Sequence, residues 1–157
     1  MTRFDELLSA LASRGVDFIL VGGVAAVAHG SPRATRDIDI VYSRDPANLE
    51  RLVQAISPHA PYLRGAPAGL PFRLDVATLK AGLNFTLTTD LGWLDLLGEI
   101  AGGGDYKSLL PHSVSIDLYG RTCRVLDLES LIRTKKAAGR PKDFEAIAEL
   151  EALRGRK

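Results

Sequence analysis

Hydrophobic residues recur with a helical spacing at both ends of the chain and cluster in short strand-like runs between them. Near the N-terminus, one face of residues 2–14 is apolar, which predicts a helix. Thr2 and Asp5 resemble an N-terminal cap for this helix, and Gly15 ends it. Similar spacing and capping residues predict further helices over residues 24–29, 45–56, 128–138 and 141–153.

Short apolar runs between these helices predict strands, and turns between four of the runs predict two hairpins. Residues 57–71 and 101–105 are rich in glycine, proline or alanine and predict loops. Strands and helices do not alternate regularly, which favours an α/β (α+β) fold with a mixed sheet over a doubly wound one. The predicted strands are residues 17–21, 37–42, 74–77, 84–88, 93–97, 113–119 and 122–126.

The composition is typical of a small globular protein and does not by itself indicate a function. The 157 residues suit a single domain over residues 1–157, and 46% of them are hydrophobic, enough for a buried core. The net charge of +1 predicts no broad basic surface for nucleic acid or anionic lipid. A single cysteine, Cys123, excludes an internal disulfide. No signal-peptide pattern and no membrane-spanning run is present, so we expect a cytoplasmic protein.

The strongest chemical pattern lies in residues 21–42, VGGVAAVAHGSPRATRDIDIVY. Asp37 and Asp39 are two residues apart on a predicted strand and so point to the same face. Two adjacent like charges need compensation, and a divalent cation supplies it with carboxylate oxygens as ligands. The alternative is a half-exposed strand whose polar residues face water. Gly22 and Gly23 upstream favour the metal site, because their backbone can approach a phosphate closely.

A metal site for phosphoryl transfer needs a third carboxylate, and the residues alone leave its identity open. Three aspartates have apolar neighbours on both sides and are costly to bury without a partner. Each of them is also compatible with a surface position on a strand. The candidates are Asp75, Asp95 and Asp117.

Basic residues gather at a predicted helix break, in KKAAGRPKD. One interpretation is a solvated helix end, where positive charge is favoured by the helix dipole. The other is a clamp for a triphosphate or an acceptor. Arg33 and Thr35, between the glycines and the aspartates, are further candidates for nucleotide contacts.

Three segments, taken in order, resemble one protein family. GGVAAVAHGSPRATRDIDIVY, TTDLGWLDLLGEI and LDLESLIRTKKAAGRPKDFEAIAEL are similar to small bacterial proteins of the nucleotidyl transferase AbiEii toxin group. Gly-Gly followed by Asp-Ile-Asp also resembles the pattern G-[GS] then D-h-[DE]-h of the wider nucleotidyltransferase superfamily. The resemblance extends from about Val16 to Leu153 and implies a mixed sheet flanked by helices.

The resemblance also implies an activity and a site. The activity is transfer of a nucleoside monophosphate from an NTP to an acceptor hydroxyl with release of pyrophosphate, dependent on Mg²⁺ or Mn²⁺. Asp37, Asp39 and Asp95 would be the catalytic and metal-binding residues, with Asp95 preferred as third carboxylate by family position. The residues implied in nucleotide binding are Gly22, Gly23, Lys135, Lys136, Arg140, Lys142 and Asp143.

Two other functions remain open at this point. One is a nucleotide-binding module that keeps the fold without turnover. The other is a toxin–antitoxin component whose acceptor is tRNA or a protein. The toxin relatives often carry extra helical domains, whereas this chain has only short C-terminal helices. A homodimer or an antitoxin partner is therefore among the expected assemblies.

Overall fold

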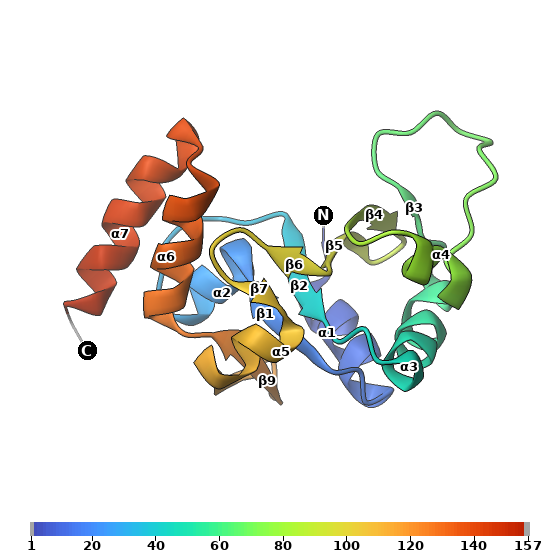
Figure 1. Ribbon diagram of the computed structural model, residues 1–157, viewed down its shortest axis with the longest axis horizontal. Helices are drawn as coiled ribbons and strands as arrows, with labels where there is room; N and C mark the ends of the chain where they lie inside the picture. The colour runs from blue at the N-terminus through green and yellow to red at the C-terminus, as the bar shows by residue number, and fades with distance from the viewer. Residues whose placement is uncertain (1, 156–157) are drawn as a thin grey trace.

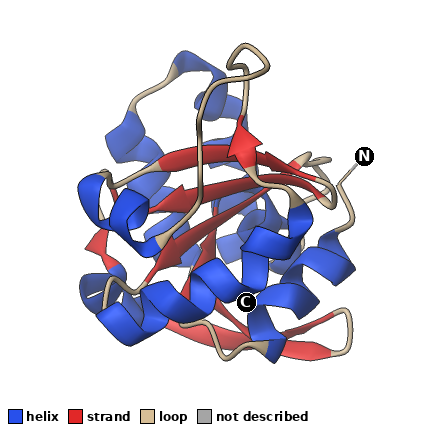
Figure 2. Ribbon diagram, turned by 90° about the vertical axis from the view of Figure 1, so that its right-hand side faces the viewer, coloured by secondary structure: helices blue, strands red, loops and turns tan. Residues whose placement is uncertain are grey.

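A computed structural model describes residues 2–155 of the chain, apart from the side chain of Lys142. Helices stand around a central sheet, as Figures 1 and 2 show. The helices are α1 (Phe4–Ser13), α2 (Gly22–Ala28), α3 (Pro46–Ile56), α4 (Val76–Ala81), α5 (Tyr106–Leu109), α6 (Leu128–Ala138) and α7 (Phe144–Arg154). The strands are β1 (Phe18–Val21), β2 (Asp37–Tyr42), β3 (Tyr62–Leu63), β4 (Phe85–Thr89), β5 (Gly92–Leu97), β6 (Glu99–Ile100), β7 (Gly104–Asp105), β8 (Ser113–Leu118) and β9 (Arg121–Leu126).

Seven strands form one mixed sheet in the order β3-β4-β5-β2-β1-β9-β8, and β6 and β7 pair separately. The central strands β1 and β2 are antiparallel. Each has a parallel neighbour from later in the chain, β9 beside β1 and β5 beside β2. The predicted mixed sheet and both predicted hairpins are confirmed, because β4 pairs with β5 and β8 with β9 in antiparallel register.

The core fixes which face of the central strands is available for chemistry. Ile38 and Ile40 on β2 are fully buried, as are Leu94 and Leu96 on β5. Side chains alternate between the two faces of a strand. Burial of these four residues on one face therefore directs the intervening residues of both strands to the other face.

Three features of the sequence prediction differ from the structure. Residues 74–77 do not form a strand, because the Asp75 side chain accepts a hydrogen bond from the Thr78 backbone and begins helix α4. Thr2 does not cap α1 either. Its hydroxyl instead donates to the Arg36 carbonyl and accepts from the Trp93 backbone. The predicted loop 57–71 also contains β3, a two-residue strand at the sheet edge.

The C-terminal helices pack beside α2, at the end of the molecule opposite α3 and α4 in Figure 1. Asp127 caps α6 as predicted, by accepting a hydrogen bond from the Ser130 backbone. Gly139 ends α6 in the left-handed conformation, and the chain turns back into α7. None of the helices within residues 2–155 has both the length and the apolar composition needed to cross a lipid bilayer.

Candidate active site

Three carboxylates meet on the face of the parallel strands β2 and β5 that lies opposite the buried Ile38 and Ile40. Asp39 lies directly opposite Asp95 in the strand register, and Asp37 precedes Asp39 by one pleat. Oxygen atoms of the three side chains all lie within 4.8 Å of one another. We call this cluster the aspartate triad. The structure thus brings together the three residues that the sequence analysis assigned to catalysis and metal binding.

Gly22 leaves room for the triad. A Cβ atom at this position would lie only 2.0 Å from Oδ2 of Asp39, so any other residue would collide with the carboxylate. Its φ of +65° is also a conformation that side chains disfavour. Gly23 leaves room for Thr35, because a Cβ at this position would lie 2.6 Å from the Thr35 hydroxyl. Both glycines are therefore required, because β2 and the segment before it lie very close to the start of α2.

Packing three acids together perturbs their titration. Burial, a hydrogen bond with Asp95 and the charges of Asp37 and Asp95 raise the pKa of Asp39 to about 8. Burial and the neighbouring Asp95 also raise the pKa of Asp37. Arg64 opposes both shifts with its positive charge but does not cancel them. The triad therefore has an excess of negative charge whenever all three groups ionise.

The donor set fits a hard divalent cation. Oδ1 of Asp39 is buried and has no hydrogen-bond partner among the described residues. Such an orphaned carboxylate oxygen is costly in a folded protein unless something pairs with it. Carboxylate oxygens converging from two strands are the ligands that Mg²⁺ and Mn²⁺ prefer. The triad can hold a divalent cation with Asp37, Asp39 and Asp95 as ligands.

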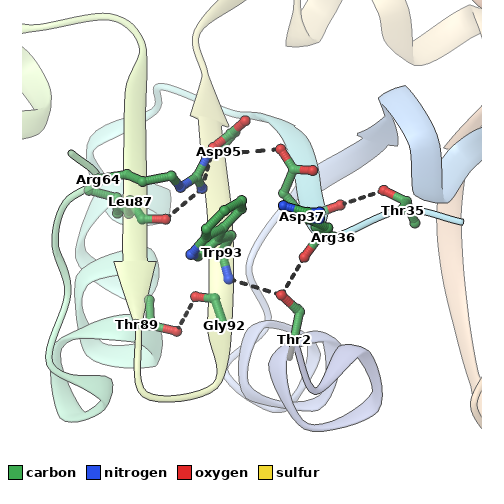
Figure 3. Close-up of polar contacts among 10 residues, drawn as sticks. All are labelled: Thr2, Thr35, Arg36, Asp37, Arg64, Leu87, Thr89, Gly92, Trp93 and Asp95. Atoms are coloured by element: carbon green, nitrogen blue, oxygen red, sulfur yellow. Dashed lines mark hydrogen bonds and ion pairs between the residues drawn. The ribbon is translucent and has the colours of Figure 1, made fainter.

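Arg64, which the sequence analysis did not single out, also reaches the triad. Its Nη2 donates to Oδ1 of Asp95 at 2.8 Å, and its Nη1 lies 3.9 Å from Oδ2 of Asp37. The guanidinium lies 4.6 Å from the centre of the Trp93 ring, a cation–π contact. Figure 3 shows the guanidinium beside the Trp93 ring, pointing toward Asp95 and Asp37. Arg64 lies in a predicted loop, where no periodic pattern marked it.

Two clefts lie near the triad. One, of about 300 Å³, is lined by Gly22 and Asp39 at one end and by Lys135 and Arg140 at the other. The second, of about 430 Å³, is lined mainly by apolar groups, including Phe4 and Trp93. Clefts of this size can hold part of a nucleotide or a sugar. Asp39 of the triad lines the 300 Å³ cleft, whereas the 430 Å³ cleft lies beside Arg36 and Trp93, which are neighbours of the triad just before β2 and on β5.

The predicted nucleotide-binding side chains do not all lie in one cleft. Lys135 and Arg140 line the 300 Å³ cleft, and both form ion pairs with the buried Asp143, at 3.6 and 2.8 Å. Arg33 and Lys136 do not line this cleft and instead pair with glutamates of α7. Thr35 donates to the Asp37 carbonyl and lines the apolar cleft. The Lys142 side chain lies outside the described residues.

The other two candidate carboxylates lie elsewhere. Asp75 caps α4, and its interaction with Thr78 lowers its pKa. Asp117 is exposed on β8, at the far edge of the sheet, and accepts a hydrogen bond from Thr122. Asp95 is therefore the aspartate that the fold places beside Asp37 and Asp39. The deciding information is the pairing of β5 with β2.

The sequence as a whole matches a known family. The family model described as "Nucleotidyl transferase AbiEii toxin, Type IV TA system" matches residues 6–135. The chain belongs to the AbiEii family. A comparison with curated protein sequences found no match. The matched range includes Gly22, the aspartate triad and Arg64, and it ends within α6.

Solved structures share the fold of this AbiEii family member. A Thermotoga maritima protein assigned as a nucleotidyltransferase has a TM-score of 0.59 at 17% identity, over 95% of this chain and 94% of its own. ANT(2″)-Ia in complex with adenylyl-2″-tobramycin has a TM-score of 0.56 at 16% identity, over 98% and 95%. An antigenic nucleotidyltransferase-like protein from Paracoccidioides brasiliensis has a TM-score of 0.56 at 19% identity, over 97% and 77%. The chain therefore has a nucleotidyltransferase fold.

Proposed function

We propose that this protein transfers a nucleoside monophosphate from an NTP to an acceptor hydroxyl and releases pyrophosphate. The observation that carries the proposal is the aspartate triad, in which Asp39 and Asp95 are paired in the strand register and lie next to Asp37. Gly22 lies beside the triad, where a larger residue would collide with Asp39. Family membership and the shared fold support the reaction class. A divalent cation, Mg²⁺ or Mn²⁺, bound by the triad would neutralise charge on the transferred phosphate.

The chain's own residues account for the proton and the position of the reactants. The acceptor oxygen forms a bond to the α-phosphorus, and the bond from that phosphorus to the bridging oxygen of the β-phosphate breaks. Pyrophosphate leaves with the electron pair. We assign the removal of the proton from the acceptor hydroxyl to Asp95, whose strand position is paired with that of Asp39.

The triphosphate fits the 300 Å³ cleft, which runs from Gly22 to the α6 end. Lys135 and Arg140 are the cations on that wall, and Asp143 between them fixes their positions through two ion pairs. Flexible lysine and forked arginine side chains are both suited to phosphate oxygens. The acceptor would then enter from the apolar cleft beside Trp93, on the other side of Asp37.

Calorimetry with each of the four NTPs, with and without Mg²⁺, tests the proposal on wild type and Asp39→Asn. Asp117→Asn, another strand aspartate far from the triad, is the matched control. We expect Mg²⁺-dependent binding in wild type and Asp117→Asn and its loss in Asp39→Asn. Equal binding by Asp39→Asn would refute the site. Binding without release of labelled pyrophosphate from γ-labelled NTP, in the presence of cell extract as the acceptor source, would instead indicate a non-catalytic module.

The family description adds a biological expectation, that of a toxin with an antitoxin partner. Expression of an active toxin should arrest growth, and Asp37→Ala should relieve the arrest. Analysis of the labelled macromolecules in arrested cells would separate a tRNA acceptor from a protein one. Equal growth with wild type and Asp37→Ala would count against toxicity through this site.

A further inference from the structure

Arg64 occupies a place where it must compete with any cation bound by the triad. Among the described side chains, which exclude that of Lys142, it is the one basic group that forms an ion pair with the triad. A guanidinium remains protonated at all working pH values, so it always brings a positive charge. The Asp95 oxygen that accepts its hydrogen bond at 2.8 Å is one of the oxygens available as a metal ligand.

The contacts of the guanidinium are incomplete. Nη2 is well placed, because it donates to Asp95 and also to the Leu87 carbonyl at 2.7 Å. Nη1 is 3.9 Å from Asp37, beyond hydrogen-bond distance. Nε is buried without a hydrogen-bond partner, a costly arrangement. Arg64 also leaves Oδ1 of Asp39 unpaired. The ion pair thus compensates the negative charge of Asp95, but it leaves the Nε–H group of Arg64 without an acceptor.

The side chain can leave the triad without any change in the sheet. The Arg64 backbone is anchored to β4, since its N–H donates to the Thr86 carbonyl at 2.9 Å. Beyond it, Gly65 begins the exposed segment that projects from the molecule between β3 and α4 in Figure 1. Among the described residues, the guanidinium is held by Trp93, Leu87 and the two aspartates (Figure 3). Release of the guanidinium therefore needs a change of side-chain rotamer and no change in the backbone hydrogen bond that anchors Arg64 to β4.

We propose that Arg64 is an internal counter-ion of the aspartate triad and that a divalent cation must displace the Arg64 guanidinium in order to bind. Arg64 thereby lowers the metal affinity of the site. This inference rests on the proposed function, because it takes the triad to be the metal site. Displacement frees a guanidinium at the rim of the triad, where an anionic substrate group has access to it. Arg64 thus couples cation binding to the exposure of a phosphate-binding group.

Mn²⁺ binding to the full chain, followed by the electron paramagnetic resonance signal of free Mn²⁺, tests this without any catalytic assay. Arg64→Gln removes the charge and is expected to tighten Mn²⁺ binding about tenfold or more. Arg64→Lys retains the charge and should bind Mn²⁺ more weakly than Arg64→Gln. Arg44→Gln is the matched control, because Arg44 also lies over a ring, that of Tyr42, but beyond the opposite end of β2. Its affinity should equal that of wild type.

Thermal denaturation provides a second measurement on the same variants. Without metal, Arg64→Gln should melt at a lower temperature than wild type, because the triad loses its counter-ion. Added Mn²⁺ should raise its melting temperature more than that of wild type. Unchanged or weaker Mn²⁺ binding by a folded Arg64→Gln protein would overturn the proposal.

Asp39→Asn separates the two ideas. If it abolishes Mn²⁺ binding while Arg64→Gln leaves affinity unchanged, the triad is the metal site and the counter-ion role of Arg64 is refuted alone. If Asp39→Asn binds Mn²⁺ as tightly as wild type does, the metal site of the proposed function fails, and the role of Arg64 fails with it.

Discussion

Replacing Asp39 by asparagine should make the metal-free protein more stable at neutral pH. Burial beside Asp37 and Asp95 raises the pKa of Asp39 to about 8, from an ordinary value of 3.8. Below the lower value, both the folded and the unfolded chain hold the proton. Between the two values only the folded chain holds it, so the free energy of unfolding falls as the pH rises, and above about 8 it no longer changes through this group.

The magnitude follows from the interval between 3.8 and the working pH. At about 1.4 kcal/mol for each pH unit, keeping Asp39 in its folded environment at pH 7 costs on the order of 4 kcal/mol. Asparagine keeps the shape of the side chain and carries no charge. We expect Asp39→Asn to raise the free energy of unfolding by about 2–4 kcal/mol at pH 7 and to have little effect near pH 4.

Urea denaturation followed by circular dichroism, with a chelator present and the pH varied from about 4 to 8, measures this difference. Asp117→Asn, at an exposed strand position, should follow the wild-type curve. Saturating Mg²⁺ should stabilise wild type and leave Asp39→Asn unchanged, because only the wild-type triad binds it. An Asp39→Asn protein that is no more stable than wild type at pH 7 in chelator would refute the electrostatic reasoning.

Three further predictions concern other parts of the chain. Gly22→Ala places a Cβ 2.0 Å from Asp39 Oδ2. In thermal denaturation it should lower the free energy of unfolding by at least about 2 kcal/mol. In calorimetry it should abolish Mg²⁺-dependent NTP binding. Asp75→Ala removes the cap of α4 and should cost about 1 kcal/mol in urea denaturation, with NTP binding unaltered. Lys135→Met should weaken NTP binding about tenfold in calorimetry, whereas Lys136→Met, outside the cleft, should not. Equal effects of the two lysine variants would contradict the placement of the triphosphate.

Local patterns sufficed for those parts of the site that lie within one element. The alternation of DIDIV places Asp37 and Asp39 opposite the buried Ile38 and Ile40, as expected from the period of a strand. The choice of Asp95 could not be made from the residues alone, because it depends on which strand pairs with β2. Strand pairing between distant segments leaves no local mark in a sequence.

Arg64 and α4 show two other limits of local patterns. Arg64 acts through its position next to a two-residue edge strand, too short to give any period. The run around Asp75 is apolar and short, which suits a strand or a helix equally well. There the hydrogen bond between Asp75 and Thr78 decides for the helix. A single capping contact thus outweighs the apolar pattern.

The pairing of β2 with β5 also orders events during synthesis. Asp39 and Asp95 are neighbours in the sheet but more than fifty residues apart in the chain. A nascent chain that has reached only α4 carries Asp37 and Asp39 but does not yet carry Asp95. The triad arises only when β5 has emerged and added to the edge of β2, and such long-range pairings form late in folding. A chain interrupted before β5 therefore cannot carry the proposed chemistry.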